Sequence, residues 1–512
     1  MRKIALILFL VMFTSGGAFA APSNTSGPWG IDAAGFQDLS TALASPSTVG
    51  KTIVISKPMT INSMTVSGSR AVKVIAGGRI DIAAGKTLTF SSDSSFLADN
   101  HSAFGGTGTV TFSSGSVNEV RPEWWGAASG TESAPAIQAA ITAAEGTTAY
   151  VRLSGFYTVS KQITVTKTIR IVGAGMNSGI YNLTGANSSA LYFNGSAWPG
   201  CNRSVLSNFK IEGNGTTSGH GIWVHNSAAW MHFENVYLTG NHHGYYCDGT
   251  DGTAFSQRFV NCYAKANYGN GFYENTTGNP NPASEFIHCQ AESNVIGIEW
   301  SSSQLNIIGG VYETNVINEM YLHGTATLMG VYFEESKGPV GYGNNAMLRV
   351  AGYGTVVSGC KFAINATQNI RCIHYESFTI VENNAFNGST PAGSIGIYNG
   401  SRGQIYTGSR ILANISNAVA TYSSLGTAET TFADISGNYT FPSVTSKGAV
   451  TAATHILMNG TLTNGTPGTN NGNQIKMGMC PAGSAANYSI FVDSADGKLK
   501  YKDGGGVVNL LY

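Results

Sequence analysis

The stretch NCYAKANYGNGFYEN, residues 261–275, decides the fold, because its first half recurs along the chain. Its opening residues NCYAKAN align with NFKIEGN at 208–214, NVYLTGN at 235–241 and HCQAESN at 288–294. Looser copies begin at residues 310, 330, 359 and 384, so that eight copies follow one another about every 25 residues. A recurring period of this length is typical of a repeat architecture.

Apolar and polar residues alternate within each copy, which predicts short strands with one buried face. Two apolar columns follow from the alignment. The first contains Val236, Cys262, Cys289, Val311, Val331 and Cys360, and the second contains Ile211, Leu238, Ala264, Ala291, Phe333 and Phe362. No helical pattern interrupts residues 150–430. We therefore predict an all-β fold: a single-stranded, right-handed parallel β-helix solenoid with two or three strands in each turn.

The residue that closes each copy is an asparagine, which tolerates left-handed backbone and can bond to the same group one turn away. The predicted ladder contains Asn214, Asn241, Asn267, Asn294 and Asn315. Two of the cysteines also follow the repeat. Cys262 and Cys289 occupy one inward column, which predicts small core residues or, alternatively, a disulfide between neighbouring turns.

Segments of different character flank the repeats. Ile137, Ala140, Ile141 and Ala144 recur at helical spacing within residues 133–146, which predicts a short N-terminal capping helix that Ser133 begins and Gly146 ends. Residues 21–117 are β-rich and form either further coils or a separate β-domain. Residues 436–473 are predicted to be a linker, and residues 474–512 a small β-rich segment ending in a hairpin.

The segments VRPEWWGA (120–127), SAPAIQAAITAAEG (133–146) and YVRLSGFYTVSKQITVTKTIRIVGAG (150–175) together resemble the pectate-lyase-like superfamily. Its members include rhamnogalacturonase- and epimerase-like domains and phage tailspikes. The resemblance implies a right-handed β-helix over residues 118–435, an activity on polysaccharide and, from the tailspikes, a homotrimer. This chain departs from the family at ASGTESAP (128–135), where relatives carry an Asp-rich segment and Glu132 is the only acid.

The composition of the chain argues against two classes of binding partner. Charged residues make up 11% of the chain and the formal net charge is +0, which argues against nucleic acid and anionic membrane. Residues 1–20 have the basic start, apolar stretch and Ala18-Phe19-Ala20 end of a signal peptide. We therefore expect cleavage near Ala20 and export to the medium, the periplasm or the cell surface. The apolar stretch is too short to insert in a membrane as a span.

The outward positions of the repeats predict the functional residues. Tyrosine rings spaced one turn apart offer flat apolar faces to a sugar, and carboxylates or a lysine beside them can bond hydroxyl groups. The predicted substrate-binding residues are Tyr237, Tyr263, Tyr312 and Tyr332. The predicted catalytic residues are Lys265, Glu292, Glu313 and Glu334. The alternative is that tyrosine is simply favoured in strands.

The sequence thus predicts an exported carbohydrate-active protein, either a polysaccharide hydrolase or a lyase that acts in a Tyr-lined groove. The alternative is a non-catalytic glycan-binding or structural surface or fibre protein with the same solenoid. No cofactor and no metal site are predicted. Calcium is expected only for a lyase, near Asp248 and Asp251, where the alternative is a plain turn. His242 and His243 are predicted to be surface residues.

Overall fold

The computed structural model describes residues 30–248, 254–275, 283–301, 303–334, 346–364, 371–377 and 379–388, with shorter stretches between 395 and 510. The predicted signal peptide and most of the predicted linker lie outside these ranges. The chain divides into two compact units, Met1–Ala326 and Thr327–Tyr512, which are described separately. Among the described residues, no helix combines the length and the apolar character that crossing a bilayer requires.

The first unit begins with a small three-sided coil of parallel strands. Its sheets have the orders β1-β2-β5-β8, β3-β6-β9 and β4-β7-β10, so each turn gives one strand to each side. Of the two alternatives for residues 21–117, further coils are therefore the correct one. The elements are β1 (Ile31–Asp32), η1 (Ala33–Gly35), α1 (Leu39–Ala44), η2 (Pro46–Thr48), β2 (Thr52–Ile55), β3 (Pro58–Ile61), β4 (Met64–Val66), β5 (Ala71–Val74), β6 (Arg79–Ile82), β7 (Thr87–Phe90), β8 (Ser95–Ala98), β9 (Phe104–Gly106) and β10 (Thr109–Phe112).

The predicted helix is present as α2 (Ala134–Ala144), and its predicted apolar stripe is buried. It does not cover an open end, because it packs against β10 on one side and β12 (Tyr150–Leu153) and β14 (Ile163–Val165) on the other. Its first turn is also not capped as expected. Ser133 occupies the cap position, but its hydroxyl accepts no N–H of the helix and donates to the Thr131 carbonyl at 3.0 Å, while the Glu132 carboxylate accepts from the Ala134 N–H at 3.0 Å.

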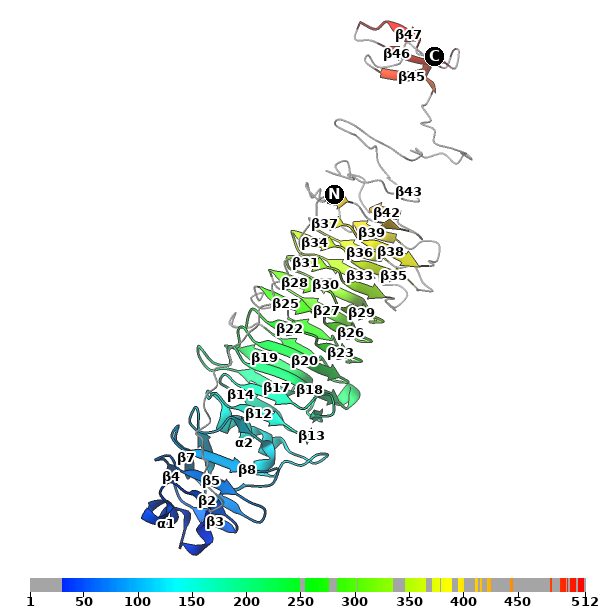
Figure 1. Ribbon diagram of the computed structural model, residues 1–512. Coiled ribbons are helices and arrows are strands. Elements are labelled where there is room, and N and C mark those ends of the chain that lie inside the picture. The colour runs from blue at the N-terminus through cyan, green and yellow to red at the C-terminus, as the bar shows by residue number, and fades with distance from the viewer. Residues whose placement is uncertain are drawn as a thin grey trace, which may run out of the picture. The chain divides into compact units, whose positions relative to one another are not determined.

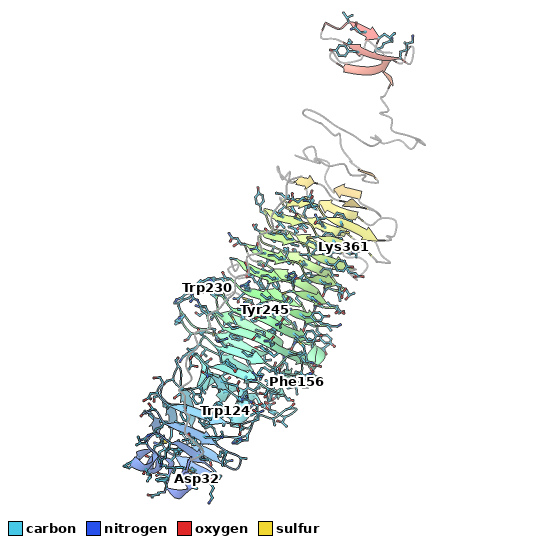
Figure 2. All side chains as sticks on the ribbon, viewed as in Figure 1. Asp32, Trp124, Phe156, Trp230, Tyr245 and Lys361 are labelled. Carbon is cyan, nitrogen blue, oxygen red and sulfur yellow. The ribbon has the colours of Figure 1, made fainter. Side chains whose placement is uncertain are left out.

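The segment VRPEWWGA (120–127), which we call the Trp motif, joins the two coils of the first unit through β11 (Glu119–Val120) and η3 (Pro122–Trp125). Trp124 (Figure 2) packs edge-on to Phe96 of the small coil, with ring centroids 5.0 Å apart. The neighbouring Glu123 accepts a hydrogen bond of 2.6 Å from the Tyr157 hydroxyl of the larger coil. The motif therefore serves architecture here.

The larger coil is the predicted right-handed parallel β-helix, in which strands of successive turns lie side by side (Figure 1). Most turns give two strands to a long sheet and one to a second sheet. In the first unit the long sheet has the order β11-β12-β13-β15-β16-β18-β20-β22-β23-β25-β26-β28-β29, and the second sheet β14-β17-β19-β21-β24-β27-β30. The remaining elements are β13 (Phe156–Val159), β15 (Arg170–Gly173), β16 (Gly179–Asn182), β17 (Ser189–Asn194), β18 (Val205–Gly213), η4 (Gly215–Thr217), β19 (His220–Asn226), β20 (His232–Thr239), β21 (Tyr245–Cys247), β22 (Arg258–Val260), β23 (Tyr263–Lys265), β24 (Phe272–Glu274), β25 (Ser284–Ile287), β26 (Gln290–Glu292), β27 (Ile296–Trp300), β28 (Leu305–Ile308), β29 (Val311–Glu313) and β30 (Asn318–Leu322).

Stacked side chains fill this coil. Phe233, Phe259 and Phe286 are in register on successive turns, with centroids 4.7 and 4.6 Å apart and nearly parallel rings. The inward column of Val236, Cys262 and Cys289 is also confirmed, and all three side chains are buried. Both cysteines are free thiols, so the inter-turn disulfide is not formed.

The asparagine ladder is confirmed over four turns and corrected at its start. Asn267 donates its side-chain N–H to Asn294 Oδ1 at 2.8 Å, and Asn294 donates to Asn315 Oδ1 at 3.0 Å. Asn241 receives its bond from Asn182, at 2.9 Å, whereas Asn214 is exposed and outside the ladder. The left-handed residues are those just before the ladder, such as Ala266 with φ 52°.

The second unit repeats the parallel pattern and ends in a separate small sheet. There β45 and β46 pair antiparallel, as do β46 and β47, while β44 is parallel to β45. The elements are β31 (Ala326–Met329), β32 (Tyr332–Glu334), β33 (Ala346–Val350), β34 (Thr355–Ser358), β35 (Lys361–Ile364), β36 (Arg371–Tyr375), β37 (Thr379–Glu382), β38 (Ala385–Gly388), β39 (Ile395–Asn399), β40 (Arg410–Leu412), β41 (Ile415–Ser416), β42 (Thr421–Ser424), β43 (Ser443–Val444), β44 (Met479–Cys480), β45 (Ser489–Asp493), β46 (Leu499–Lys502) and β47 (Val508–Leu510).

Candidate functional site

Strand register brings most of the predicted site residues of the first unit onto one face of the long sheet. Tyr237 pairs with Tyr263 on the next turn. In the adjacent column Lys265 pairs with Glu292, and Glu292 pairs with Glu313. The prediction that these five residues line up on successive turns is therefore correct.

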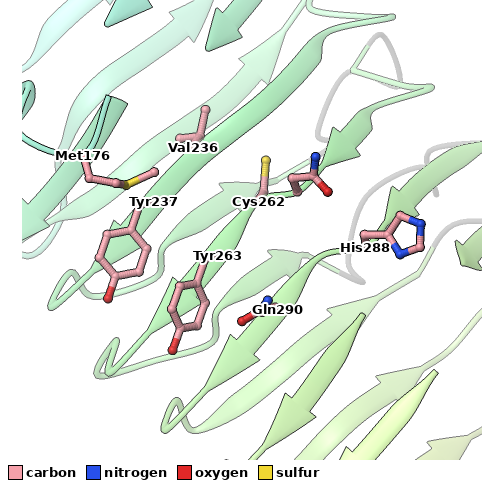
Figure 3. A pocket seen from close by; sticks show the side chains of 8 residues that line it. Met176, Val236, Tyr237, Cys262, Tyr263, His288 and Gln290 are labelled. Atoms are coloured by element: carbon pink, nitrogen blue, oxygen red, sulfur yellow. The ribbon is translucent and has the colours of Figure 1, made fainter. Parts of the chain in front are cut away.

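The contacts within this face join its polar groups to one another. The Tyr237 and Tyr263 rings lie 4.8 Å apart, centroid to centroid, and project from neighbouring strands in the same direction (Figure 3). The Tyr263 hydroxyl donates to the Glu292 carboxylate. Lys265 Nζ lies 2.9 Å from the other Glu292 oxygen.

These contacts shift the pKa values of the three side chains that make them. Burial acts to raise the pKa of Glu292, but bonds from Tyr263 and Lys265 bring that pKa below its usual value. The bond to Glu292 raises the pKa of Lys265. Burial, together with the bond to Glu292, raises the pKa of Tyr263. Lys265 is therefore held as an ammonium, which is the opposite of the depressed pKa that a lyase base requires.

The prediction that Tyr312 faces outward is wrong, because its side chain is fully buried and the residue pairs with Ala291 of the inward column. Val311 takes the outward position beside Gln290 instead. The left-handed residue of the preceding bend is Gly309, at the position of His288, so Tyr312 is the third residue after it and falls on the inward face. Gly310 falls at the position of Cys289, and the Tyr312 ring fills the core of this turn.

Tyr332 and Glu334 lie in the second unit, so they are described apart from the other predicted residues. The Tyr332 hydroxyl donates to Glu334 Oε2 at 2.8 Å. The Lys361 ammonium lies 5.1 Å from the centroid of the Tyr332 ring. These two neighbouring turns thus repeat the combination of a tyrosine, an acid and a lysine.

A shallow pocket of about 340 Å³ opens beside Tyr237 and Tyr263 (Figure 3). Its other lining residues are Met176, Val236, Asn261, Cys262, His288 and Gln290. Asn261 and His288 take left-handed backbone, with φ 50° and 51°, at the bend between the two long-sheet strands. The pocket is therefore part of a bend that recurs on each turn.

The second sheet carries a longer row of aromatic side chains that was not predicted from the sequence. Tyr192, Trp223, Tyr246 and Tyr273 are in register on four successive turns, and we call them the aromatic column. Their centroids are 4.8, 5.6 and 5.5 Å apart in that order, and all four side chains are partly exposed. The register continues through Glu299 to Tyr321.

Histidines flank one side of the aromatic column. His220 and His243 stack with centroids 5.1 Å apart, and His243 lies 4.8 Å from Tyr273. His243 Nδ1 accepts from the Asn270 backbone N–H at 2.8 Å, so Nε2 carries the proton of the neutral ring. Burial lowers the pKa of His220 to about 3, and burial likewise lowers that of His243. His243 is thus part of a packed cluster and not the plain surface residue that we predicted.

Carboxylates stand at two places beside the aromatic column. Asp248 Oδ2 accepts from Trp223 Nε1 at 3.3 Å and lies 2.5 Å from His225 Nδ1. Glu299 accepts from Asn270 Nδ2 at 2.7 Å and lies 3.3 Å from His323 Nε2. The predicted calcium loop is only partly described, because Asp251 lies outside the described residues. Within those residues no group of three or more acidic, His or Cys side chains is placed to hold a metal.

A weak sequence signal for the aromatic column exists. A glycine precedes three of its members by two positions: Gly221 before Trp223, Gly244 before Tyr246 and Gly271 before Tyr273. These glycines are in register because their neighbours pair. A Cβ at Gly244 would lie 2.6 Å from the Gly271 carbonyl oxygen, so this position requires glycine.

Comparisons with known proteins find distant structural neighbours only. No family model matches the chain, and no curated protein matches it by sequence. The A-module of a mannuronan C-5 epimerase from Azotobacter vinelandii aligns with a TM-score of 0.44 and 17% identity, over 60% of this chain and 95% of that one. A DFA-IIIase from Arthrobacter chlorophenolicus A6 aligns with a TM-score of 0.43 and 11% identity, over 59% and 94%. The Dettilon tailspike protein aligns with a TM-score of 0.43 and 13% identity, over 60% and 68%. With scores and identities this low, the matches assign neither an activity nor a substrate.

Proposed function

We propose that this protein is an exported polysaccharide-binding β-helix that holds an extended, uncharged glycan along the aromatic column. The observation that supports the proposal most is the register of Tyr192, Trp223, Tyr246 and Tyr273 on four turns. Parallel strands are spaced about 4.8 Å apart, so these rings form a continuous strip. Aromatic faces pack against the C–H faces of sugars, while hydroxyl groups bond to polar tips.

The charge of this sheet supports an uncharged glycan. The strands β17, β19, β21, β24, β27 and β30 contain neither Lys nor Arg. The acidic groups beside the column are Asp248, which is paired with His225, and Glu299, which is paired with His323, while burial holds His220 and His243 neutral. On the strands β17 to β30 of this sheet a uronate polymer would meet carboxylates without a Lys or Arg to neutralise it.

Affinity electrophoresis in gels containing dextran, soluble starch, galactomannan, polygalacturonate or alginate tests this function. We expect one or more neutral gels to retard the wild type, and Trp223→Ala and Tyr246→Ala to restore most of its mobility. Tyr268→Ala is the matched control, because Tyr268 is 52% exposed and outside the column. Retardation by the uronate gels alone, or full retardation of the Trp223 variant, would contradict the proposal.

Turnover is the second candidate, and the pairing of Glu292 with Glu313 favours it. Adjacent strands place such carboxylates about 5 Å apart, which suits a retaining glycosidase, in which one acid must be protonated. Glu292 is ill-suited to be that acid, because its pKa is lowered. The proposal therefore assigns the acid role to Glu313 and the nucleophile role to Glu292. A lyase is less well supported, since Lys265 is engaged with Glu292.

Reducing-end release and absorbance of unsaturated product, measured on the same polysaccharides, test turnover. We expect any hydrolysis to raise reducing ends without the absorbance change, and Glu292→Gln and Glu313→Gln each to abolish it. If neither signal rises on any polymer that retards the protein, the chain binds glycan without cleaving it.

The homotrimer stays a prediction, which the molar mass from light scattering checks.

A further inference from the structure

A second aromatic feature lies at the turn that leads from the second sheet back to the long sheet. Register places Arg203, Trp230, Ser256 and Ala283 at the same position of this turn, because Val205 pairs with His232, His232 with Arg258 and Arg258 with Glu285. All four residues take left-handed backbone, with φ between 53° and 61°. A bulky residue is rare in this conformation, and Ser256 and Ala283 show that the turn does not need one.

Trp230 nevertheless occupies this position with its side chain partly in solvent (Figure 2). It is 41% exposed, and Trp198, from the loop before β18, is 60% exposed. The two indoles meet edge to face, with centroids 5.4 Å apart. Phe255 packs edge-on to Trp230 at 5.0 Å, and the Arg203 guanidinium lies 5.6 Å from the Trp230 centroid. Trp230 is therefore held in place although much of it faces water.

A pocket of about 300 Å³ adjoins the Trp230 ring. Its wall includes Met231 and Trp230, and its rim carries the pair Arg258 and Glu285, whose nearest atoms are 3.4 Å apart. Its other lining residues are His232, Ser256, Gln257 and Ala283. An apolar aromatic wall beside both donors and acceptors matches the two kinds of surface that a pyranose ring presents.

We propose that Trp198, Trp230 and this pocket form a separate subsite for one pyranose unit. The subsite rests on the proposed glycan-binding function, but its residues are not those of the aromatic column. The exposure of two indoles and the strained backbone of Trp230 are explained by a ligand that covers them. Arg258 and Glu285 bond the hydroxyl groups of the sugar at the rim.

Tryptophan fluorescence tests the subsite, because Trp198 and Trp230 are far more exposed than the buried Trp124 and Trp300. The probes are maltotetraose, mannotetraose and tetragalacturonate, with acrylamide as the quencher. We expect one of these sugars to reduce quenching in Trp223→Ala, which lacks the tryptophan of the aromatic column, and to have no effect when Trp198→Phe and Trp230→Phe are added to that variant. Comparison of the neutral sugars with tetragalacturonate reports whether the ring bound is charged.

Binding strength supplies the second readout. Trp230→Ala is expected to weaken oligosaccharide binding about tenfold, as the loss of one stacking contact predicts, while the melting temperature stays level or rises. Tyr268→Ala again serves as the exposed aromatic control. If quenching of Trp223→Ala is unchanged by every sugar while the gels still retard the wild type, the subsite is refuted and the column stands. If the gels do not retard the protein either, both proposals fail.

Discussion

Single residues in this coil owe their role to the turn on which they stand, and Tyr312 is the clearest case. Tyr263 and Tyr312 occupy the same place in the aligned repeats, but only Tyr263 faces outward. Because the side-chain period of a strand is two, a shift of one residue at the bend moves the ring to the other face. Tyr312 is the third residue after the left-handed Gly309, whereas Tyr263 is the second residue after the left-handed Asn261.

The burial of Tyr312 predicts a stability effect rather than a binding effect. Tyr312→Ala should cost roughly 3–5 kcal/mol of unfolding free energy, the range for loss of a large buried aromatic. Tyr263→Ala should cost much less, because Tyr263 is partly exposed. Thermal unfolding followed by circular dichroism measures both. An unchanged melting temperature for Tyr312→Ala would contradict the inward assignment.

Glu319 is a second residue whose role depends on the turn on which it stands. It is in register with Gly297, so a carboxylate follows a column of glycines, and Asn315 donates its side-chain N–H to it. The side chain is fully buried, and burial raises the pKa of Glu319 well above its usual value. A buried carboxyl with a raised pKa therefore ends the asparagine ladder of the first unit.

This carboxyl predicts a pH dependence with a definite sign. Above the pKa of about 4.3 that glutamate has in an unfolded chain, the unfolded state loses the proton while the folded state keeps it. The folded protein therefore loses stability as pH rises from there toward the folded pKa. Glu319→Gln should remove this loss, so its melting temperature should exceed that of the wild type by more at pH 8 than at pH 4. A difference that does not change with pH would refute the assignment.

At the scale of elements, the asparagine ladder holds one bend of each turn. Asn267 accepts from the Asn241 backbone N–H at 3.0 Å and donates to the Leu238 carbonyl at 3.1 Å, and its side chain is buried. The Asn241 N–H lies beyond the end of β20, and leaving such a group unpaired is costly.

Removal of one ladder amide should therefore destabilise the coil. Asn267→Ala is expected to lower the unfolding free energy by about 1–3 kcal/mol per group left unpaired. Asn214→Ala is the matched control, because Asn214 was predicted in the ladder but is exposed. Thermal melting of the two variants should separate them clearly, and equal melting temperatures would remove the ladder as a source of stability.

At the scale of the whole molecule, the two sheets differ in charge over the strands of the first unit, and this difference separates the two proposed glycan faces. The long-sheet face contains the Lys265 and Glu292 pair, whereas the strands that carry the aromatic column have no Lys or Arg. Salt screens interactions between exposed charges, with a Debye length of about 8 Å at 0.15 M and 3 Å at 1 M.

Retention by the aromatic column should therefore be nearly independent of salt. We expect the mobility of the wild type in a neutral polysaccharide gel to change little between low and high NaCl concentration. Binding that weakens at least tenfold over that range would instead point to the charged long-sheet face. The variants Trp223→Ala and Tyr237→Ala, measured under the same conditions, assign the effect to one sheet.

The sequence by itself predicted the parallel coil, because a two-residue alternation inside a repeat of about 25 residues is typical of short strands stacked turn on turn, and the family resemblance implied its right hand. The sequence also determined the Tyr237–Tyr263 and Lys265–Glu292 alignments, since these turns have nearly equal lengths, and the closing Asn315 of the next, shorter turn placed Glu313 beside Glu292. Only the tertiary structure decided that Tyr312 is buried, that Asn182 replaces Asn214, and that four rings align on the second sheet. The physical reason is that register between turns is set at the bends and by loops of unequal length, where one residue more or less leaves the local pattern intact but changes which side chains meet.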